Sequence, residues 1–364
     1  ATVLIGHNVT YDLMWLWECG FKYNGVIFDT MLAEYVLSRG NPEKYSFSLE
    51  ACADRHELNT RKQDTLKEYF AKGMGVDEIP KQELKEYLRA DLKATQELCA
   101  SQYKKLINSP LMDTVILTNK VAMTLARTHR NGFKVDQDVL ESVRKEFEAE
   151  KISIEKRLSA QVRDLMGDTP INLNSPEQMS WVIYSRKPKD KSLWANYFSP
   201  YMDKNEYKDL VREHSDVVYK TTAVKCSDCN GEGYFRRTKK DGTPFAKPSR
   251  CPTCNTQGYL FISNKNVAGL KFSAPTAKWV SANGFTINKN YLDTLRSVAK
   301  RNGMTDAVNF LTDLQRLSAL DTYLSSFVDG IKAHVKQDGM LHVRLLQHRT
   351  ATGRFSGADP NMQN

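Results

Sequence analysis

The chain ends in the stretch His348–Asn364, HRTATGRFSGADPNMQN, and this stretch decides how the rest of the sequence is interpreted. Gly353 and Gly357 permit tight turns, and Arg349 and Arg354 supply cations. Small hydroxyl and amide side chains fill the remaining positions: Thr350, Thr352, Ser356, Asn361, Gln363 and Asn364. Aliphatic residues are almost absent, so we expect a rigid polar loop that offers donors to a nucleic-acid backbone and the minor-groove edge of its bases. Composition alone favours an ordinary surface loop.

The order of the residues in this stretch carries more information than their composition. Thr350-Ala-Thr-Gly-Arg354, then Ser356, then Asp359-Pro-Asn-x-Gln-Asn364 closely resembles the block before the first catalytic carboxylate motif of family A DNA polymerases, the DNA polymerase I group. The resemblance implies that the block lies at the polymerase palm and that Arg354 reads the minor groove at the primer terminus. It also implies DNA contacts from the other polar residues of the block: His348, Arg349, Thr352, Asn361, Gln363 and Asn364.

The bulk composition limits the architecture and the partners. A chain of 364 residues predicts two or three domains, and 41% hydrophobic residues permit real cores. No apolar run approaches the ~20 residues of a membrane span, and no signal peptide opens the sequence, so we expect no membrane partner and a location in the cytoplasm of a bacterial cell or phage-infected host. The net charge of +9 suits a polyanionic partner.

Two pairs of polar residues stand out near the start of the chain. Val3-Leu-Ile-Gly6 predicts a buried strand, and Asn8 and Asp12 follow it four residues apart, so that one helical turn places both on one face. Tyr87 and Asp91 repeat this spacing in the strongly helical segment 83–104. Taken singly, the first pair favours a helix cap and the second a solvated helix face.

Together the two pairs resemble the second and third motifs, N-x-x-x-D and Y-x-x-x-D, of the DEDDy 3′–5′ exonucleases. The segment from Asp29, Asp-Thr-Met-Leu-Ala-Glu-Tyr, resembles the proofreading domain of DNA polymerase I. The resemblance implies that residues 1–107 form an α/β RNase H-like exonuclease domain.

Hydrolysis of a phosphodiester by the two-metal route needs several carboxylates around ions about 3.5–4 Å apart. By resemblance, Asp12 and Asp91 bind Mg²⁺ or Mn²⁺, Tyr87 orients the attacking water and Asn8 supports the site or the substrate strand. The family's first motif, D-x-E, would lie upstream of Ala1, so the expected metal site is half-built.

Residues 108–190 predict helices of a polymerase thumb. The segment 111–130 is amphipathic and ends at Asn131-Gly132, and apolar residues from 138 to 166 recur at three- and four-residue steps, which predicts one long helix packed along a partner. The segment 172–179 resembles the sequence that follows the thumb helices in family A, with Ser175 as cap and Pro176 at the first helical position. Periodicity alone fits a plain helical hairpin equally well.

Two C-x-x-C pairs, each followed by glycine, lie within the segment 191–265. This pattern is typical of a structural tetrahedral Zn²⁺ site at Cys226, Cys229, Cys251 and Cys254, with free thiols or a redox pair as alternatives. The pairs resemble the repeats of the DnaJ-type zinc domain, although Thr256 stands where glycine is usual. The segment lies outside the family A pattern and is interpreted as a thumb insertion. The isolated Cys19, Cys52 and Cys99 are expected to be reduced core thiols.

Cations and aromatic residues lie between the two C-x-x-C pairs. This mixture suits nucleic-acid contact, and a merely solvated hairpin fits almost as well. The residues expected to bind DNA are Arg236, Arg237, Lys239 and Lys240. The insertion would grip DNA or recruit a partner.

Residues 266–364 are expected to complete the thumb and begin an α+β palm. The palm carboxylate and fingers motifs of the family are not found, so this segment alone should not polymerise, and the palm and fingers would come from a continuation of the chain or a second polypeptide.

The sequence therefore predicts the exonuclease, thumb and early-palm portion of a phage-like or bacterial DNA-directed DNA polymerase. Its partners would be primer–template DNA and single-stranded 3′ ends. Two alternatives remain open: a stand-alone RNase D-like 3′–5′ exonuclease, and a non-catalytic DNA-binding clamp or subunit with a degenerate exonuclease fold.

Overall fold

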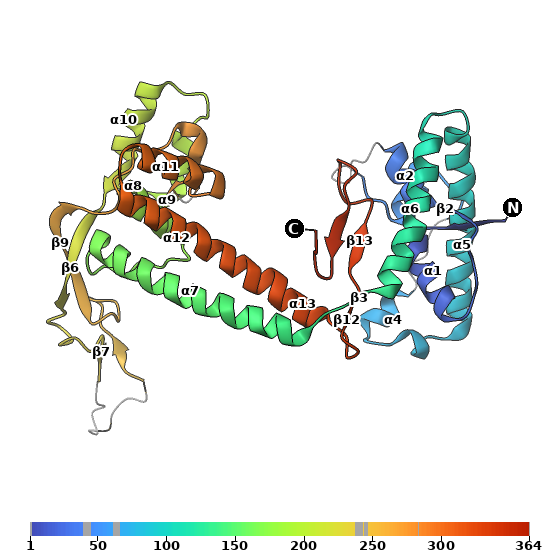
Figure 1. Cartoon of the computed structure of the whole chain (residues 1–364), viewed down its shortest axis with the longest axis horizontal. Helices are drawn as coiled ribbons and strands as arrows, with labels where there is room; N and C mark the ends of the chain where they lie inside the picture. The colour runs from blue at the N-terminus through green and yellow to red at the C-terminus, as the bar shows by residue number, and fades with distance from the viewer. Residues whose placement is uncertain are drawn as a thin grey trace. The chain divides into compact units, whose positions relative to one another are not determined.

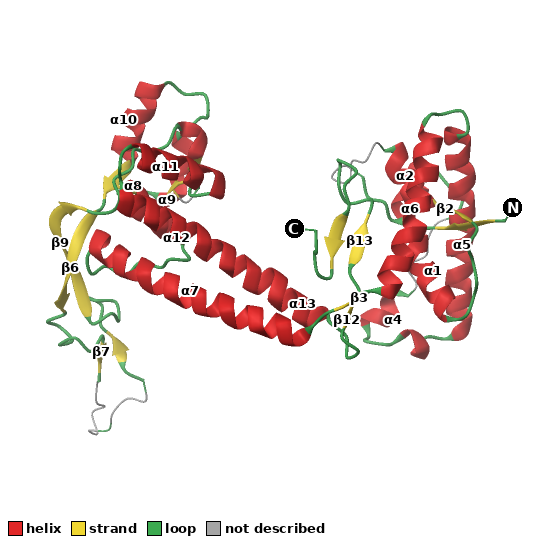
Figure 2. Cartoon of the chain, viewed as in Figure 1, coloured by secondary structure: helices red, strands yellow, loops and turns green. Residues whose placement is uncertain are grey.

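The computed structural model describes residues 2–38, 45–60, 66–236, 243, 247–282 and 284–363. The chain forms two compact units: unit 1 comprises Ala1–Val143 and Leu324–Asn364, and unit 2 comprises Arg144–Tyr323. Figures 1 and 2 show the helices and strands of each unit. In the part of the chain that is described, no helix is both long and apolar enough to cross a membrane. The four-part division of the sequence at residues 107, 190 and 265 stays a prediction.

Unit 1 begins with a β-α-β element. Strand β1 (Val3–Gly6) and strand β2 (Val26–Asp29) pair in parallel, with Gly6 opposite Asp29, and helix α1 (Val9–Glu18) connects them. The prediction that β1 is a buried strand is wrong, because Val3 and Ile5 are 45% and 43% exposed, while Leu4 on the other face packs against the core. Alternate residues of a strand point to opposite faces, and one face of this two-stranded sheet stays open in the described structure.

Helices make up most of the remaining first segment of unit 1. Their bounds are α2 (Thr30–Leu37), α3 (Leu49–Arg55), α4 (Lys67–Ala71), the 3₁₀ turn η1 (Val76–Glu78), α5 (Lys81–Leu106) and α6 (Leu111–Asn131). Helix α6 packs on α1 and α2, and α5 packs on α2, α3 and β1 (Figure 1). The expected helices over 83–104 and 111–130 are confirmed. Beyond the β-α-β element, the RNase H-like fold stays a prediction. The thiol of Cys52 is buried as expected, whereas Cys19 is exposed.

The carboxylate of Asp29 links the start of two helices. Its Oδ1 accepts hydrogen bonds from the amides of Asn8 (3.0 Å), Met31 (2.9 Å) and Leu32 (3.3 Å), and its Oδ2 accepts one from Val9 (2.8 Å). These amides belong to the N-termini of α1 and α2, which favour negative charge. Asp29 is fully buried, and this burial raises the pKa of its carboxyl to about 6, against the opposing effect of the amides.

A second buried carboxylate, Glu34 on α2, joins three helices. Its oxygens accept hydrogen bonds from His56 Nε2 (2.8 Å), Arg55 Nε (3.0 Å) and Gln102 Nε2 (2.9 Å), from the end of α3 and from α5. Burial alone would raise the pKa of Glu34, but the hydrogen bonds from His56, Gln102 and Arg55 outweigh burial and lower it to about 2. Ionised Glu34 therefore holds α3 and α5 against α2.

The C-terminal segment of the chain completes unit 1. Its elements are the π-helical turn η4 (Tyr323–Val328), α13 (Asp329–His334), β12 (Met340–Leu341), β13 (Arg344–Leu346) and β14 (Ser356–Ala358). Strand β12 pairs with β3 (Phe133–Lys134), and β13 pairs antiparallel with β14. The segment from Met340 to Leu346 thus contains two short strands with different partners. His129 Nε2 on α6 accepts from the Leu345 amide (2.8 Å), and the Tyr35 hydroxyl on α2 donates to the Thr350 carbonyl (2.7 Å).

Unit 2 is built around two long helices, α7 (Gln137–Met166) and α12 (Thr305–Thr322). Three ion pairs join them, between Lys151 and Asp321, Arg157 and Asp313, and Glu150 and Arg316. The expected long helix packed along a partner is confirmed. Smaller elements pack beside this pair: α8 (Pro176–Tyr184), β4 (Arg186–Pro188), α9 (Lys191–Trp194), η2 (Ala195–Tyr197), α10 (Lys204–His214), β5 (Ser215–Val217), η3 (Ala277–Trp279), β10 (Val280–Ser281), β11 (Gly284–Phe285) and α11 (Lys289–Arg301).

The core of unit 2 gathers large side chains from many of these elements, among them Leu158, Met179, Trp194, Phe310 and Leu317. Helix α8 begins as predicted, with the Ser175 side chain accepting from the Gln178 amide and Pro176 in the first turn. The sequence signals for this helix are therefore confirmed in detail.

A two-stranded ribbon extends from the end of α7 (Figure 2). It consists of β6 (Tyr219–Lys225) and β9 (Tyr259–Val267), with β7 (Tyr234–Phe235) and β8 (Ser249–Arg250) beyond it. At its root the Asp168 amide donates to the Thr221 carbonyl (2.9 Å), and the Ala223 amide donates to Asp168 Oδ2 (2.9 Å). A Cβ at Gly167 would collide with the Thr221 carbonyl oxygen, so glycine is required where the ribbon meets α7.

We predict that Asp29→Ala destabilises unit 1 by about 3 kcal/mol or more, because four buried amides lose their acceptor. Chemical denaturation followed by circular dichroism measures this change. The matched control is Ser48→Ala, which removes an exposed cap that accepts from the Ala51 amide and the Ser46 hydroxyl and should cost about 1 kcal/mol. Equal losses in the two variants would contradict the linking role of Asp29.

The pKa of Glu34 predicts a pH dependence. A carboxyl whose pKa is lowered on folding adds stability above its unfolded pKa of about 4.5, and this stability is lost as the pH falls towards 2. The free energy of unfolding of the wild type relative to Glu34→Gln should therefore fall by about 2 kcal/mol between pH 6 and pH 3. A difference that does not change over this range would show that Glu34 is not held ionised.

Candidate functional site

Four cysteines meet at the end of the ribbon, where the sequence predicted a metal site. The Sγ atoms of Cys226, Cys229, Cys251 and Cys254 all lie within 4.8 Å of one another, and all four residues are buried. Cys226 and Cys251 are separated by 3.9 Å, and Cys229 and Cys254 by 3.6 Å, measured between sulfurs. A tetrahedral ion with bonds of about 2.3 Å to sulfur separates its ligands by about 3.8 Å, so the four thiols fit such an ion.

The two halves of this cluster have the same backbone hydrogen bonds. The Gly233 amide donates to Cys229 Sγ (3.2 Å), and the Gly258 amide donates to Cys254 Sγ (3.3 Å). The Cys226 amide donates to the Gly258 carbonyl (2.9 Å), and the Cys251 amide donates to the Gly233 carbonyl (3.0 Å). Amides directed at the sulfurs stabilise thiolates, which are the form that binds a metal. Burial would raise the pKa of Cys229, but its hydrogen bonds lower it, whereas burial raises the pKa of its neighbour Cys254.

The two halves of the cluster differ at one position. Gly231 has φ of 83°, and Thr256 at the equivalent place has φ of 75°. A β-branched residue is strained in this left-handed region, so the departure of Thr256 from the usual glycine has a conformational cost. Gly233 and Gly258 cannot be replaced in the same way, because a Cβ there would collide with carbonyl oxygens of Thr256 and Gly231, respectively.

The basic segment between the two cysteine pairs is described only in part. Arg236 follows β7, and Tyr234 and Arg250 form a cross-strand pair between β7 and β8. Arg237, Lys239 and Lys240, which were predicted to bind DNA, lie outside the described residues.

The terminal block forms a hairpin in unit 1. Residues 347–355 connect β13 to β14, and the Thr350 hydroxyl donates to the Arg354 carbonyl across the loop (2.5 Å). Most residues of the block that were expected to contact DNA are exposed, namely Arg349, Thr352, Arg354, Asn361 and Gln363. Asn364 lies outside the described residues. The expected polar loop is present and is held by the β13–β14 pairing.

His348 is half-buried, in contrast to the other described residues of the block that were expected to contact DNA. Its ring lies edge-on to Phe47, with centroids 6.4 Å apart. Burial, and then the nearby Arg349 and Arg344, lower the pKa of His348, so its ring is neutral at pH 7. It can donate or accept a hydrogen bond without adding charge to the loop.

The predicted exonuclease residues belong to two helices of unit 1. Asn8 is the N-cap of α1 with φ of 62°, and its amide is held by Asp29, while Asp12 lies one turn later. Partial burial raises the pKa of Asp12, although a backbone hydrogen bond opposes the effect. Tyr87 and Asp91 are half-buried on α5, on one face of the helix.

Asp12 and Asp91 are the residues expected to bind a divalent ion. In the described part of the chain, Asp12 and Asp91 join no group of three or more Asp, Glu, His or Cys side chains that could hold an ion. That the site is half-built stays a prediction. Their roles, like those of Asn8 and Tyr87, stay predictions. The sequence did not identify Asp29 as the residue that fixes α1, although an aspartate between a strand and a helix is a cap signal.

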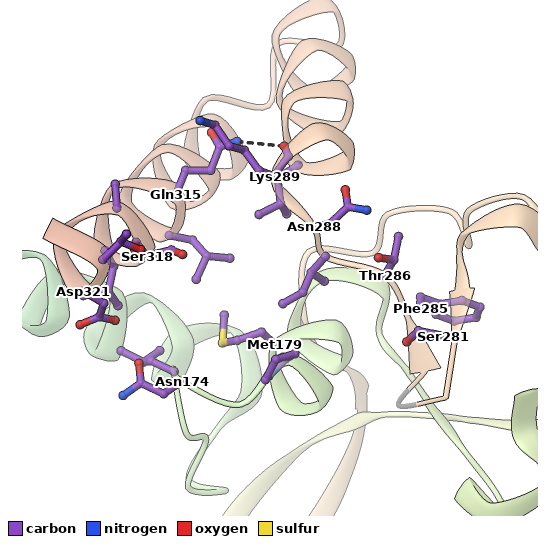
Figure 3. A pocket seen from close by; sticks show the side chains of 18 of the residues that line it. Asn174, Met179, Ser281, Phe285, Thr286, Asn288, Lys289, Gln315, Ser318 and Asp321 are labelled. Carbon is purple, nitrogen blue, oxygen red and sulfur yellow. Dashed lines mark hydrogen bonds between the residues drawn. The ribbon is translucent and has the colours of Figure 1, made fainter. Parts of the chain in front are cut away.

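A cavity of about 730 Å³ in unit 2 was not predicted either (Figure 3). Its floor is apolar, with Met179, Leu292 and Leu314, and its rim carries polar groups such as Asn288. The Gln315 side chain donates to the Lys289 carbonyl across the rim, as drawn in Figure 3 (3.4 Å). The lining comes from helices far apart in sequence, so no local pattern signals it.

Comparison with curated proteins finds partial similarity to proteins named DNA polymerase I. The Pseudomonas aeruginosa protein is 26% identical over 196 residues, which cover 50% of this chain and 20% of that protein. The Synechocystis protein is 24% identical over 186 residues, or 50% of this chain and 18% of that protein. The Bacillus subtilis protein is 26% identical over 211 residues, or 55% and 23%. The chain thus matches about a fifth of the length of these relatives. No protein-family model matches it.

Comparison with solved structures finds a shared fold. The POL domain of Pol1 from M. smegmatis, solved in complex with DNA primer–template and dNTP, has a TM-score of 0.54 and 19% identity. The match covers 98% of this chain and 42% of that chain. The chain therefore shares its fold with that polymerase domain and has partial sequence similarity to proteins named DNA polymerase I.

The strain at Thr256 predicts the effect of a substitution. Thr256→Gly should slow the loss of added Zn²⁺ from the cysteine cluster to a chelator by about fivefold, because it removes about 1 kcal/mol of backbone strain. The matched control is Asn255→Gly, at φ of 47°, since asparagine tolerates this region and its replacement should change little. Equal effects of the two variants would refute the assignment of strain to Thr256.

Proposed function

We propose that the chain is the exonuclease, thumb and early-palm portion of a family A DNA-directed DNA polymerase and that it binds primer–template DNA. The exposed polar hairpin at the end of unit 1 is the observation that carries this proposal. Its ordered motif, its rigid β13–β14 base and the similarity to proteins named DNA polymerase I support the same function.

The chemistry of the hairpin suits the proposed contact. Arg349 and Arg354 are exposed cations on a loop without an aliphatic surface, and Arg354 has the fork of donors that reads acceptors at base edges and phosphates. Thr352, Asn361 and Gln363 add neutral donors and acceptors to the same block. The neutral ring of His348 adds one more hydrogen-bonding group to this block. Arg354 would hold the primer end, and the other residues would fix its register.

The second part of the proposal concerns a 3′–5′ proofreading site. Asp12 and Asp91 would hold Mg²⁺ or Mn²⁺, which supplies activation of water and stabilisation of the leaving oxygen in this class of reaction. Tyr87 would orient the water and Asn8 would position the strand. The site needs further carboxylates, which the rest of a longer chain or a second polypeptide would contribute.

The cysteine cluster has a structural role in this proposal. The ion that it would hold is Zn²⁺, bound by Cys226, Cys229, Cys251 and Cys254. Strands β7 and β8 form only one short pair, so the tip of the ribbon has little core of its own and a bound ion would hold it together. The tip would then present Arg236 and Arg250 near a bound duplex.

Fluorescence anisotropy with a labelled primer–template tests the central proposal. The chain should bind with an affinity that falls steeply with salt, and Arg354→Ala should weaken binding about 5- to 30-fold, equivalent to one directed arginine contact. Arg301→Ala, an exposed arginine at the end of α11, is the matched control and should bind like the wild type.

Other outcomes would favour the other functions. Binding that is insensitive to Arg354→Ala would refute the palm assignment. Digestion of a primer in Mg²⁺ or Mn²⁺ that is lost in Asp12→Ala and Asp91→Ala, without any effect of Arg354→Ala on binding, would favour a stand-alone exonuclease. Strong binding without digestion by the complete protein would favour a clamp.

A further inference from the structure

A basic hollow in unit 2 is lined by residues of the paired strands β4 and β5 and of segments next to them, none of which has been given a role above. Its volume is about 520 Å³. Four cationic side chains line it from β4, the residue after β4, and α10: Arg186, Lys187, Lys189 and Arg212. The rest of the lining is Ser215, Asp216, Val217 and Tyr219, so the hollow contains a single carboxylate.

One of these cations is held in place by buried groups. Arg186 Nη1 donates to the Ser215 hydroxyl (3.0 Å), and that hydroxyl in turn donates to the Val211 carbonyl of α10. Ser215 is buried, and Arg186 and Val217 form a cross-strand pair. The guanidinium is therefore fixed before any ligand arrives, which lowers the entropy lost on binding.

The other cations keep their charge available. Lys189 Nζ donates to the carbonyl of Glu213 (2.5 Å), which is a neutral group. Arg212 lies 3.7 Å from Asp209, but both side chains are about three-quarters exposed, and such a pair is weak in water. Lys187 lies opposite Asp216 in the strand register. Four cations against one carboxylate within the hollow leave a strong positive potential.

Aromatic rings stand beside these cations. Tyr219 lines the hollow and is 41% exposed. Next to β5, the rings of His214 and Tyr197 stack in parallel with centroids 3.6 Å apart. Cations that follow a backbone, together with rings on which bases stack, are the two elements of sites that bind single-stranded or frayed nucleic acid.

We propose that this hollow binds consecutive phosphates of a polynucleotide strand, at a site separate from the terminal hairpin. The hollow has more cationic side chains than a single phosphate group needs for binding. Tyr219 also offers a surface on which a base can stack, which a free phosphate does not need. The hollow also adjoins the root of the ribbon, since Tyr219 is the first residue of β6. The inference rests on the proposed function only for the identity of the strand as DNA.

Lysine footprinting of the unaltered chain tests the site directly. Acylation of Lys187 and Lys189, followed by mass spectrometry of peptides, is compared with and without a primer–template, a single-stranded oligonucleotide and inorganic tripolyphosphate. We expect DNA to slow acylation of both lysines about threefold or more, and 0.5 M salt to abolish the effect. Lys208, exposed on α10 outside the hollow, is the internal control and should react equally throughout.

The outcomes separate this inference from the proposed function. If anisotropy shows DNA binding but Lys187 and Lys189 are not protected from acylation, the proposal that the hollow binds DNA is wrong and the proposed function still holds. Absence of any DNA binding overturns both. Protection by tripolyphosphate at equal phosphate concentration, with none by DNA, identifies a small-polyphosphate site and also overturns the inference.

Variants supply an independent measurement. Replacing Arg186, Lys187 and Arg212 by Gln should make the slope of log affinity against log salt shallower by about 2 to 3 and weaken binding at low salt about tenfold or more. The control Lys300→Gln with Arg301→Gln removes two cations of unit 2 at the end of α11 and should change the slope little. Equal changes in both would show a general charge effect and contradict a defined site.

Discussion

The buried carboxylate of Asp29 is the interaction on which unit 1 depends. It accepts hydrogen bonds from the N-termini of α1 and α2 at once, so one charged group fixes the direction of both helices. Helix α1 carries Asn8 and Asp12, and α2 carries Tyr35, whose hydroxyl holds the Thr350 carbonyl. The candidate residues near the start of the chain and the polar hairpin at its end are therefore positioned by the same carboxylate.

The Glu34 network extends this arrangement to α5. Glu34 is one turn beyond the start of α2, and its hydrogen bond from Gln102 ties α2 to the helix that carries Tyr87 and Asp91. Removing a buried, hydrogen-bonded carboxylate lowers the stability of the fold more than removing one member of an exposed ion pair. The polar groups that remain are left without a partner and without water. The spatial relation of α1 and α5 within unit 1 thus rests on two acidic residues outside the predicted catalytic set.

Unit 2 uses charge differently at its two ends. Along α7 and α12, acids and bases neutralise each other across the helix pair, as Lys151 does with Asp321. At the β4–β5 hollow, cations gather with one carboxylate, and Ser215 orients Arg186 instead of neutralising it. Paired charges hold helices in register, whereas gathered charges of one sign favour an anionic ligand. In this unit, cations that face carboxylates join helices, whereas cations that face few carboxylates form a candidate binding site.

The sequence by itself determined the features that depend on near neighbours. The length of α7 follows from its helical period, the start of α8 follows from Ser175 and Pro176, and the cysteine cluster follows from two pairs whose spacing suits one ion. The tertiary structure alone decided which strand face is open at Val3 and Ile5, what Asp29 caps, and how Arg186 and Arg212 come to line one hollow. These features depend on packing between segments far apart in sequence, and local periodicity carries no information about such contacts.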